Sequence, residues 1–419
     1  MRRPTYMLIA GEASGDLLGA ELVAAMRREW LRRHVEPPAA AQPLRTTLPP
    51  RFIGAGGPRM AEAGVELATD LTRLSVIGVS DVARKYFQFR RIFEELRQLA
   101  REEQPDAVIG IDFSGFNRRF VRALRRDLAG REGPFLNWRP RMVQYVSPQV
   151  WASRPGRAFA MARDYDLVLA LFPFEVDWYA TRVPFLPVRF VGHPILDRYA
   201  GRWPMGGGGE SPDAPLVVLL PGSRRGELAR HAEPILGAAE QIAARLPARF
   251  VAVLPDAPLA EMLEHSSAVS RLKSIPGRLE IRVGGLPETL SAATLAIAST
   301  GTVTMECAYF GVPTIALYKT TWSTYCIGRC IIKVSHLAMP NILAGETLFP
   351  EFIQHQATAD HLAGAALELL QDNTRRGRVR ARLKELMTSL GEGGAAANAA
   401  AAILDLFVPD SMNGGLGRK

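Results

Sequence analysis

The sequence lacks the features of a membrane-spanning, disulfide-rich or zinc-binding protein. Its 419 residues include only three cysteines, Cys307, Cys326 and Cys330, which make neither a disulfide framework nor a zinc site. No run of about 18 apolar residues occurs, so no segment is predicted to span a bilayer. The apolar run at 7–10 is far too short for a signal peptide. We therefore expect a protein of the reducing cytoplasm.

Two common nucleotide-binding motifs are also missing. No Gly-x-x-x-x-Gly-Lys-[Ser/Thr] sequence occurs, and the first strand-to-helix turn is not Gly-x-Gly-x-x-Gly. Acidic residues are slightly scarce, since 51 Lys and Arg stand against 42 Asp and Glu, for a formal net charge of +9. This excess suits nucleic acid, phosphorylated small molecules or an acidic lipid surface, and does not choose among them.

What is present is a regular alternation of short apolar runs and longer helical patterns. This alternation is typical of parallel sheets joined by crossover helices, and the length predicts two such α/β domains. The predicted strands are 6–10, 51–53, 107–111, 142–146, 167–171 and 188–191 in the first half, and 216–220, 249–254, 280–283, 295–298 and 314–318 in the second.

The domain boundaries follow from composition. Residues 1–200 are predicted to form the N-terminal domain and 216–374 the C-terminal one, joined by a Gly/Pro-rich linker at 201–215. Residues 375–408 are helical in period and are expected to pack on the N-terminal domain or on a partner subunit, and 409–419 form a Gly-rich tail that we expect to be disordered. The Pro- and Ala-rich stretch at 37–50 is predicted to be a surface insertion.

In the first half, polar and Gly-containing turns follow three predicted strands. The turn at 11–16 reads either as a pocket wall at the carboxyl end of a strand or as an ordinary capped helix start. The glycines at 54–60 fit a phosphate cradle or a structural turn equally well. Asp112 ends a buried strand, where a carboxylate can accept a proton from a substrate hydroxyl, cap the next helix or pair with an arginine.

In the second half, two turns have the character of phosphate sites. Gly222 and Ser223 offer backbone donors before a helix, and Arg224 adds a guanidinium fork suited to a diphosphate, unless it is merely solvated. The turn at 299–302 is rich in small hydroxyl residues. Glu306 follows it by about one helical turn and is either a ligand of a ribose diol or a solvent-facing helix carboxylate. Together these turns indicate a nucleoside diphosphate.

Aromatic residues and cations alternate between residues 76 and 92. Such a segment is either an interfacial helix that inserts rings among anionic headgroups or a core helix with a basic outer face. The residues predicted to touch membrane or acyl chains are Val76, Ile77, Val79, Lys85, Tyr86, Phe87, Phe89, Arg90 and Arg91.

In their order and their residues, these motifs resemble one family, the bacterial lipid-A-disaccharide synthases, over nearly the whole chain. The resemblance implies two Rossmann-like domains facing a central cleft, as in GT-B type glycosyltransferases. It also implies an inverting transfer from UDP-2,3-diacylglucosamine to 2,3-diacylglucosamine 1-phosphate (lipid X), without metal or other cofactor. The matching stretches are 11–16, 54–60, 74–82, 105–117, 145–151, 172–175, 192–194, 221–227, 299–307 and 340–345.

The resemblance also implies roles for individual residues. Asp112 corresponds to the family's essential aspartate, the proposed base for the acceptor 6-hydroxyl. Arg224 corresponds to an arginine that supports the UDP diphosphate, and Glu306 would hold the ribose. The remaining UDP-site residues are Gly222, Ser223, Thr300, Gly301, Thr302 and Asn341, and the residues expected to line the acceptor cleft are Glu12, Ser14, Gly15, Asp16, Asn117 and His193.

The expected partners follow from the same resemblance: both acylated sugars, the anionic inner face of the bacterial inner membrane, and a second copy of the chain in a homodimer, with no role for nucleic acid.

Three positions depart from the family pattern. Ser114 stands where proline is usual, Ser153 replaces a second tryptophan after Trp151, and Asp81 stands where glutamate is common. The first two leave acyl preference open.

Two alternatives stay open beside this interpretation. A UDP-N-acetylglucosamine 2-epimerase shares the architecture, but it would need further acid and base groups facing the donor ring and leaves the 76–92 stretch unexplained. The other alternative is a non-catalytic protein that binds lipid or a nucleotide. The joint presence of Asp112, Arg224 and Glu306 argues against it.

Overall fold

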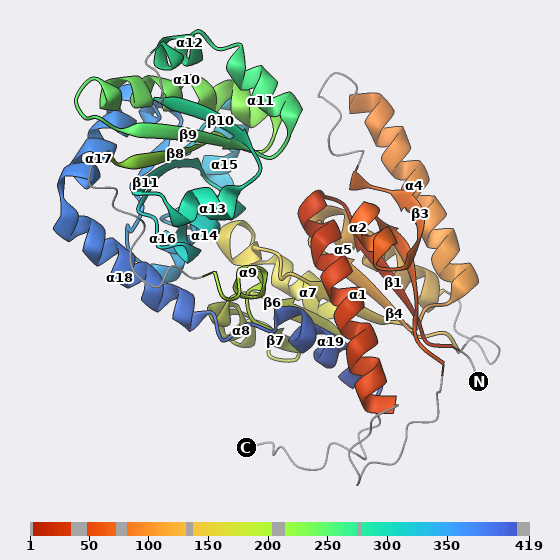
Figure 1. Cartoon of the computed structure of the whole chain (residues 1–419). Helices are drawn as coiled ribbons and strands as arrows, with labels where there is room; N and C mark the ends of the chain where they lie inside the picture. The colour runs from red at the N-terminus through yellow and green to blue at the C-terminus, as the bar shows by residue number, and fades with distance from the viewer. Residues whose placement is uncertain are drawn as a thin grey trace. The chain divides into compact units, whose positions relative to one another are not determined.

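The computed structural model describes residues 3–34, 48–72, 82–130, 137–202, 214–274 and 278–408. The chain divides into two compact units. Unit 1 comprises the residues up to Pro194 together with those from Gly393 onward, and unit 2 comprises Ile195–Glu392. Each unit holds one parallel sheet flanked by helices, which confirms the predicted α/β class with two parallel sheets (Figure 1).

The sheet of unit 1 has seven strands in the order β3-β2-β1-β4-β5-β6-β7, and every pairing is parallel. The central strands are continuous apolar runs because helices cover both faces of the sheet. The strands are β1 (Thr5–Ala10), β2 (Arg51–Gly56), β3 (Val65–Asp70), β4 (Ala107–Ile111), β5 (Arg141–Tyr145), β6 (Leu167–Ala170) and β7 (Val188–Phe190).

The helices of unit 1 pack in two layers. Helix α1 packs against α2 and α19, whereas α5 packs against α4 and α7 on the opposite face, which holds a large apolar core (Figure 1). The helices are α1 (Ala13–His34), α2 (Pro58–Glu62), α4 (Val82–Glu103), α5 (Ser114–Ala129), α6 (Val150–Ser153), α7 (Arg157–Asp164), α8 (Pro173–Ala180) and α19 (Ala395–Asp405).

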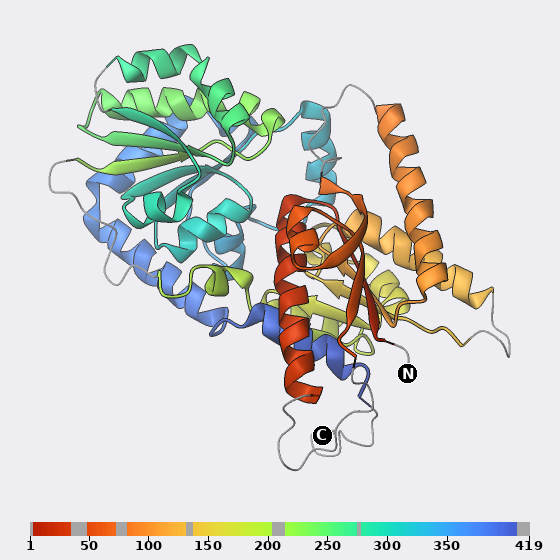
Figure 2. The ribbon, with the colours of Figure 1, turned by 45° about the vertical axis from the view of Figure 1, so that its right-hand side comes forward.

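The sheet of unit 2 has six parallel strands in the order β10-β9-β8-β11-β12-β13. Helices α10 and α17 pack together over one face, and α14 packs with α16 and α18 over the other. The turned view in Figure 2 shows this sheet between its two helical layers. The strands are β8 (Leu216–Leu220), β9 (Arg249–Leu254), β10 (Leu279–Val283), β11 (Leu295–Ser299), β12 (Thr314–Tyr318) and β13 (Glu351–Ile353).

The remaining elements complete unit 2. Helix α9 (Pro194–Arg198) begins at the boundary between the units. The others are α10 (Arg225–Ala243), α11 (Ala257–Glu264), α12 (Ser267–Lys273), α13 (Leu286–Ser291), α14 (Thr302–Tyr309), α15 (Trp322–Ile331), α16 (Met339–Ala344), the 3-10 turn η2 (Gln354–Gln356), α17 (Ala359–Gln371) and α18 (Asn373–Ser389).

Strands β3 and β13 were not predicted. The two units divide at Pro194, whereas residue 200 was the predicted end of the N-terminal domain. The segment 375–408, predicted to be helical, contains α18 in unit 2 and α19, which packs on α1 in unit 1. Most of the predicted linker, insertion and tail lies outside the described residues. In the part of the chain that is described, no helix is long and apolar enough to cross a membrane.

Candidate functional site

Both sheets place the predicted motifs where the strand order reverses. In unit 1, β1 pairs with β4 up to Ala10 and Ile111, so the turn at 11–16 and the loop beginning at Asp112 leave the sheet side by side. In unit 2, Leu220 pairs with Ala298, so the turns at 221–224 and 299–302 are also neighbours. Open α/β sheets bind ligands at such reversal points, beyond the carboxyl ends of the strands.

Asp112 is held in an unusual backbone conformation. Asp112 and Phe113 have φ angles of +47° and +40°, a left-handed region that non-glycine residues enter at a cost of about 1–3 kcal/mol each. Three hydrogen bonds fix this geometry. The amide of Asp112 donates to the Tyr145 carbonyl at 2.8 Å, and its own carbonyl accepts from Asn117 Nδ2 and from Gln144 Nε2, both at 3.0 Å. The carboxylate is therefore positioned by a rigid loop.

The carboxyl group of Asp112 is poised to accept a proton. Burial is the main factor that raises its pKa above the usual aspartate value, and repulsion from Glu12 adds to the shift. A hydrogen bond from the Phe113 amide opposes both. Among the described residues no arginine or lysine forms an ion pair with Asp112 (the ion pairs of unit 1 lie elsewhere). A carboxylate with a raised pKa is a stronger base, which suits general base catalysis.

An aromatic cluster adjoins Asp112. Phe113 stacks on Phe116 at a centroid distance of 5.4 Å, and Phe116 stacks on Phe120 at 6.3 Å. Phe93 of α4 meets Phe116 edge-on at 5.5 Å, and Phe89 approaches Phe113 at 6.5 Å. The loop that carries the carboxylate is thus backed by an apolar wall shared by α4 and α5.

Asp16 and Asn117, both predicted to line the acceptor cleft, have buried side chains. Asp16 is 2% exposed, and its carboxylate accepts hydrogen bonds from the amides of Gly57, Arg59 and Met60 at 2.7, 3.0 and 3.0 Å. It thereby caps α2. Asn117 is buried, and Nδ2 donates to the carbonyls of β1 and of the Asp112 loop. Both side chains thus hold the backbone around the predicted site in place.

The other predicted cleft residues lie at the same edge of the sheet. Glu12 is half-buried and close enough to Asp112 to influence its pKa, whereas Ser14 is exposed. Gly15 is buried, and a Cβ there would lie 3.4 Å from Ala10 Cβ. His193, beyond β7, is buried and its ring lies 5.3 Å from that of Phe172.

The predicted membrane segment is described only in part. Val76, Ile77 and Val79 lie outside the described residues, as do the side chains of Lys85 and Tyr86. Within α4, Phe87 is 66% exposed, and Arg90 and Arg91 are also exposed, whereas Phe89 is half-buried in the aromatic cluster. The described part of this helix therefore presents a ring and cations to solvent.

The first turn of unit 2 forms the start of α10. Gly222 has a φ angle of +122°, and a side chain there would meet Cβ of Glu227 at 2.8 Å. The Ser223 amide donates to Glu227 at 3.1 Å, and Arg224, whose side chain is 63% exposed, reaches the same carboxylate at 3.3 Å. The turn thus presents an exposed guanidinium at the N-terminus of a long helix, where anions bind favourably.

The second turn of unit 2 begins α14. Gly301 has a φ angle of +154° and open space where a side chain would be, and Gly301 and Thr302 are exposed. Thr300 is half-buried, with its amide bonded to the Leu317 carbonyl. Glu306 accepts a 2.6 Å hydrogen bond from the Tyr199 hydroxyl. Burial raises the pKa of Glu306, although Tyr199 and the charge of Arg198 oppose the shift.

Asn341, predicted to lie near the nucleotide, has a buried side chain with hydrogen bonds inside unit 2. Its side chain is 0% exposed, and Nδ2 donates to the Phe349 carbonyl and to Glu351 Oε1, both at 2.7 Å. Oδ1 accepts from the amides of Leu348 and Phe349. The side-chain amide of Asn341 therefore fastens the loop between α16 and β13.

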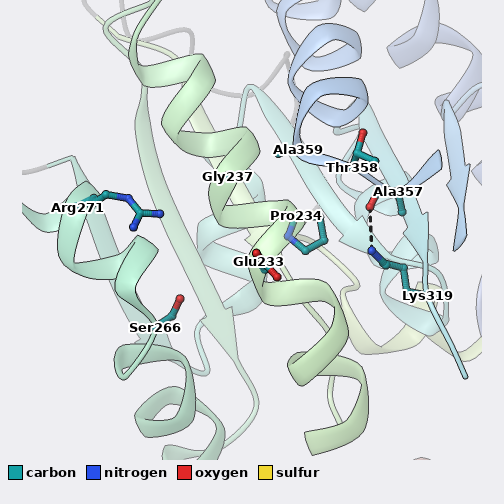
Figure 3. Close-up of a pocket in the computed structure, with 9 residues that line it drawn as sticks. All are labelled: Glu233, Pro234, Gly237, Ser266, Arg271, Lys319, Ala357, Thr358 and Ala359. Carbon is teal, nitrogen blue, oxygen red and sulfur yellow. Dashed lines mark hydrogen bonds between the residues drawn. The ribbon is translucent and has the colours of Figure 1, made fainter. Parts of the chain in front are cut away.

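A larger cavity of unit 2 lies apart from these turns. It has a volume of about 590 Å³ and is lined from α10, α12 and the start of α17 (Figure 3). Lys319 Nζ donates to the Ala357 carbonyl at its wall at 3.4 Å, and Glu233 and Arg271 also contribute. None of the residues predicted to bind UDP lines it, so it is not the predicted donor site.

Sequence reasoning missed several residues that hold the loops in place. His231 of α10 is buried between the Pro221 carbonyl, 2.9 Å from Nδ1, and the Lys319 amide, 3.0 Å from Nε2. Nε2 also lies 3.2 Å from the Lys319 carbonyl. Burial lowers the pKa of His231, although the hydrogen bonds to the Pro221 and Lys319 carbonyls oppose the shift. No local motif marks such a residue, because its partners are distant backbone groups.

Glu175 was missed as well. It lies in the first turn of α8, is 1% exposed, and accepts hydrogen bonds from Trp151 Nε1 at 3.1 Å and from the Phe172 amide at 3.3 Å. Burial outweighs these bonds and raises the pKa of Glu175 to about 7. Throughout the described ranges, no group of three His, Cys, Asp or Glu side chains is placed to hold a metal ion.

Comparison with known proteins identifies close sequence relatives. The profile of the family described as Lipid-A-disaccharide synthetase matches residues 6–404. The lipid-A-disaccharide synthase of Geobacter sulfurreducens is 36% identical over 406 residues, which are 96% of this chain and 97% of that protein. The enzyme of the same name from Myxococcus xanthus is 32% identical over 413 residues, covering 97% and 98%.

Solved structures with the same fold are more distant in sequence. A putative UDP-N-acetylglucosamine 2-epimerase from Listeria monocytogenes superposes with a TM-score of 0.59 at 15% identity and covers 97% of each chain. S. aureus MnaA with UDP gives 0.60 at 14% identity, covering 96% and 97%. CalG4, the calicheamicin glycosyltransferase, gives 0.56 at 17% identity, covering 98% and 100%. These likenesses show a shared fold and no more.

Proposed function

The chain belongs to the lipid-A-disaccharide synthase family, a glycosyltransferase family of lipid A biosynthesis, and we propose that it joins UDP-2,3-diacylglucosamine to 2,3-diacylglucosamine 1-phosphate. The products are the β-1,6-linked disaccharide 1-phosphate and UDP. The observation that carries this proposal is Asp112, a carboxylate with a raised pKa, fixed at the end of β4 without a described cationic partner.

Asp112 acts as the general base. It takes the proton of the acceptor 6-hydroxyl as that oxygen forms a bond to C1 of the donor sugar. The bond between C1 and the diphosphate breaks at the same time, and UDP leaves with the bonding electrons. A single displacement inverts the configuration at C1 and needs one carboxylate only. Proton transfer to a positioned base contributes about 10²–10⁴ to such a rate.

Unit 2 stabilises the departing UDP. Negative charge grows on the diphosphate as the bond to C1 breaks, and the turns at 221–224 and 299–302 are neighbours at the end of β8 and β11. Arg224 and the backbone donors of these turns supply positive potential where that charge develops, so the proposal involves no metal or other cofactor. Glu306 accepts hydrogen bonds from the ribose hydroxyls in this proposal, which is supported by the bond from the Tyr199 hydroxyl that orients its carboxylate.

The acylated character of both substrates fits the surroundings of Asp112. The aromatic cluster of α4 and α5 offers an apolar surface next to the carboxylate. In the same part of α4, the exposed Phe87, Arg90 and Arg91 suit contact with an anionic membrane surface. We therefore place the reaction at the inner face of the bacterial inner membrane, with the protein bound peripherally.

The second candidate function is that of a UDP-N-acetylglucosamine 2-epimerase, because proteins of that name share the fold. The sequence relatives favour the transferase, since the match to the lipid-A-disaccharide synthases extends over nearly the whole chain. One experiment separates the two. Purified protein incubated with both acylated sugars should yield disaccharide and UDP in equal amounts by mass spectrometry. Conversion of UDP-N-acetylglucosamine alone, with no disaccharide from the acylated pair, would refute the transferase.

A further inference from the structure

A second, smaller pocket lies on unit 1 beside the Asp112 loop. Its volume is about 220 Å³. None of its described lining residues is acidic. The polar part of the lining consists of two serines, a glutamine and two arginines: Ser114, Ser153, Gln149, Arg118 and Arg157. A small pocket with two guanidinium groups and no carboxylate is suited to an anion.

The pocket is built at the carboxyl ends of β4 and β5. These strands pair up to Ile111 and Tyr145, which brings the start of α5 next to the segment after β5. Ser114 is the first residue of α5, two positions after Asp112, and Arg118 follows one turn later. The pocket therefore adjoins the proposed base on the same unit.

Within the described ranges, neither arginine is neutralised by an ion pair. Both are half-buried, and no described residue forms an ion pair with Arg118 or Arg157. The nearby Arg163 and Arg125, by contrast, pair with Asp164 and Asp166. Half-buried cations without a protein partner favour a ligand that carries negative charge, and the N-terminal end of the 16-residue helix α5 adds to the positive potential.

Two of the three departures from the family pattern line this pocket. Ser114 stands where proline is usual and Ser153 where a second tryptophan is usual, and both line this pocket. Replacing these residues by serine removes the bulk of an indole and adds two hydroxyl groups. Substitutions at two positions 39 residues apart in sequence thus alter the same small volume.

We propose that this pocket binds the phosphate monoester of the acceptor sugar, with Arg118 and Arg157 as its charged contacts. This inference rests on the proposed function and names the acceptor subsite of the same reaction. The acceptor carries its reactive hydroxyl and its phosphate on one sugar ring, so the two groups must bind within the breadth of that ring. A base at Asp112 and an anion pocket that begins two residues later meet this requirement. The phosphate then orients the hydroxyl toward Asp112.

The test compares two acceptors. Arg118→Gln and Arg157→Gln remove the charge but keep a polar side chain, and Arg119→Gln is the matched control, because Arg119 is an exposed neighbour on α5 that does not line the pocket. Each variant is assayed with the phosphorylated acceptor and with the same diacylglucosamine lacking the phosphate. We expect KM for the phosphorylated acceptor to rise about 10- to 100-fold in the first two variants, corresponding to one lost charge-assisted hydrogen bond or more. KM for the dephosphorylated acceptor and for the donor should not change.

Other outcomes overturn the assignment. Equal changes of KM for both acceptors, or no change for either, would mean that the arginines do not bind the phosphate. Disaccharide formation by the wild type would still support the proposed transferase. If the pocket instead takes phosphates of membrane lipids, the variants would bind vesicles of acidic phospholipid more weakly while the ratio of the two KM values stays at the wild-type level. Absence of disaccharide from the wild type with either acceptor would defeat the proposed function itself.

Discussion

Replacement of Asp16 distinguishes a supporting residue from a substrate contact. Its carboxylate accepts three backbone hydrogen bonds, at 2.7, 3.0 and 3.0 Å, two of them fully buried. Hydrogen bonds to a charged group contribute about 1.5–3 kcal/mol each, and such values do not add fully within one cluster. Asp16→Ala leaves all three amides without their hydrogen-bond acceptor, and we expect it to lower the free energy of unfolding by about 4 kcal/mol.

Asp16→Asn should cost less. Its single oxygen can keep the bonds to Gly57 and Met60, but its NH₂ group then faces the Arg59 amide, donor against donor. We expect a loss of about 2 kcal/mol. For a unit of this size each kcal/mol lowers Tm by about 2–4 °C, so thermal and urea unfolding resolve the two variants.

Ser14→Ala is the matched control, because Ser14 is an exposed residue of the same turn and its loss should stay within about 0.5 kcal/mol. The reasoning is refuted if Asp16→Asn unfolds like the wild type yet has lost turnover, since that result would make Asp16 a substrate contact.

Three further predictions concern other buried or charged groups. Burial raises the pKa of Glu175 to about 7, so the folded protein favours the neutral carboxyl group. This stabilisation is complete below the pKa that Glu175 has in the unfolded chain, and it is lost as the pH rises through about 7. Relative to Glu175→Gln, the wild type should therefore lose up to about 3 kcal/mol between pH 5 and 9, measured by urea unfolding; parallel pH profiles would contradict this. Asn341→Ala should lower the free energy of unfolding by about 2–4 kcal/mol while UDP affinity changes little, and the reverse pattern in calorimetry would restore Asn341 as a nucleotide ligand. Arg224→Ala should weaken UDP binding by about 1.5–3 kcal/mol without affecting Tm, and an unchanged Kd would remove Arg224 from the site.

Much of the fold could be predicted because its central strands are unambiguous. Strands such as β1 and β4 are continuous apolar runs buried on both faces, and their sequence shows it directly. The missed strands are less distinct. Strand β13 has three half-buried residues, and β3 mixes buried, half-buried and exposed positions at the edge of its sheet. Neither has the apolar continuity by which a buried strand is recognised.

The sequence predicts those candidate site residues whose place follows from the order of strands and turns alone. Asp112, Arg224 and Thr302 stand at the carboxyl ends of strands, which the order of strands and turns reveals. The roles of Asp16 and Asn341 could not be read in the same way. The partner amide of Asp16 at Gly57 lies 41 residues away, and such contacts with distant backbone leave no local pattern. A polar residue in a recognisable motif can therefore have a structural role that its sequence position does not reveal.

The left-handed backbone at Asp112 and Phe113 was likewise beyond prediction. The chain adopts it because the carbonyl of Asp112 is held by Gln144 and Asn117, side chains from other elements of unit 1. Strain of this kind is maintained by tertiary contacts, so it becomes visible only when those contacts are known.

The pH dependence of transfer, measured as kcat/KM for the acceptor in the wild type and in Asp112→Asn, tests the central claim most directly. We predict an acidic limb in the wild type with an apparent pKa above that of an ordinary aspartate, because burial disfavours the ionised carboxylate. In the variant this limb should disappear and the rate should fall by about 10²–10⁴, with Kd for UDP unchanged. An Asp112→Asn protein that forms disaccharide at the wild-type rate, with the same pH profile, would contradict the account.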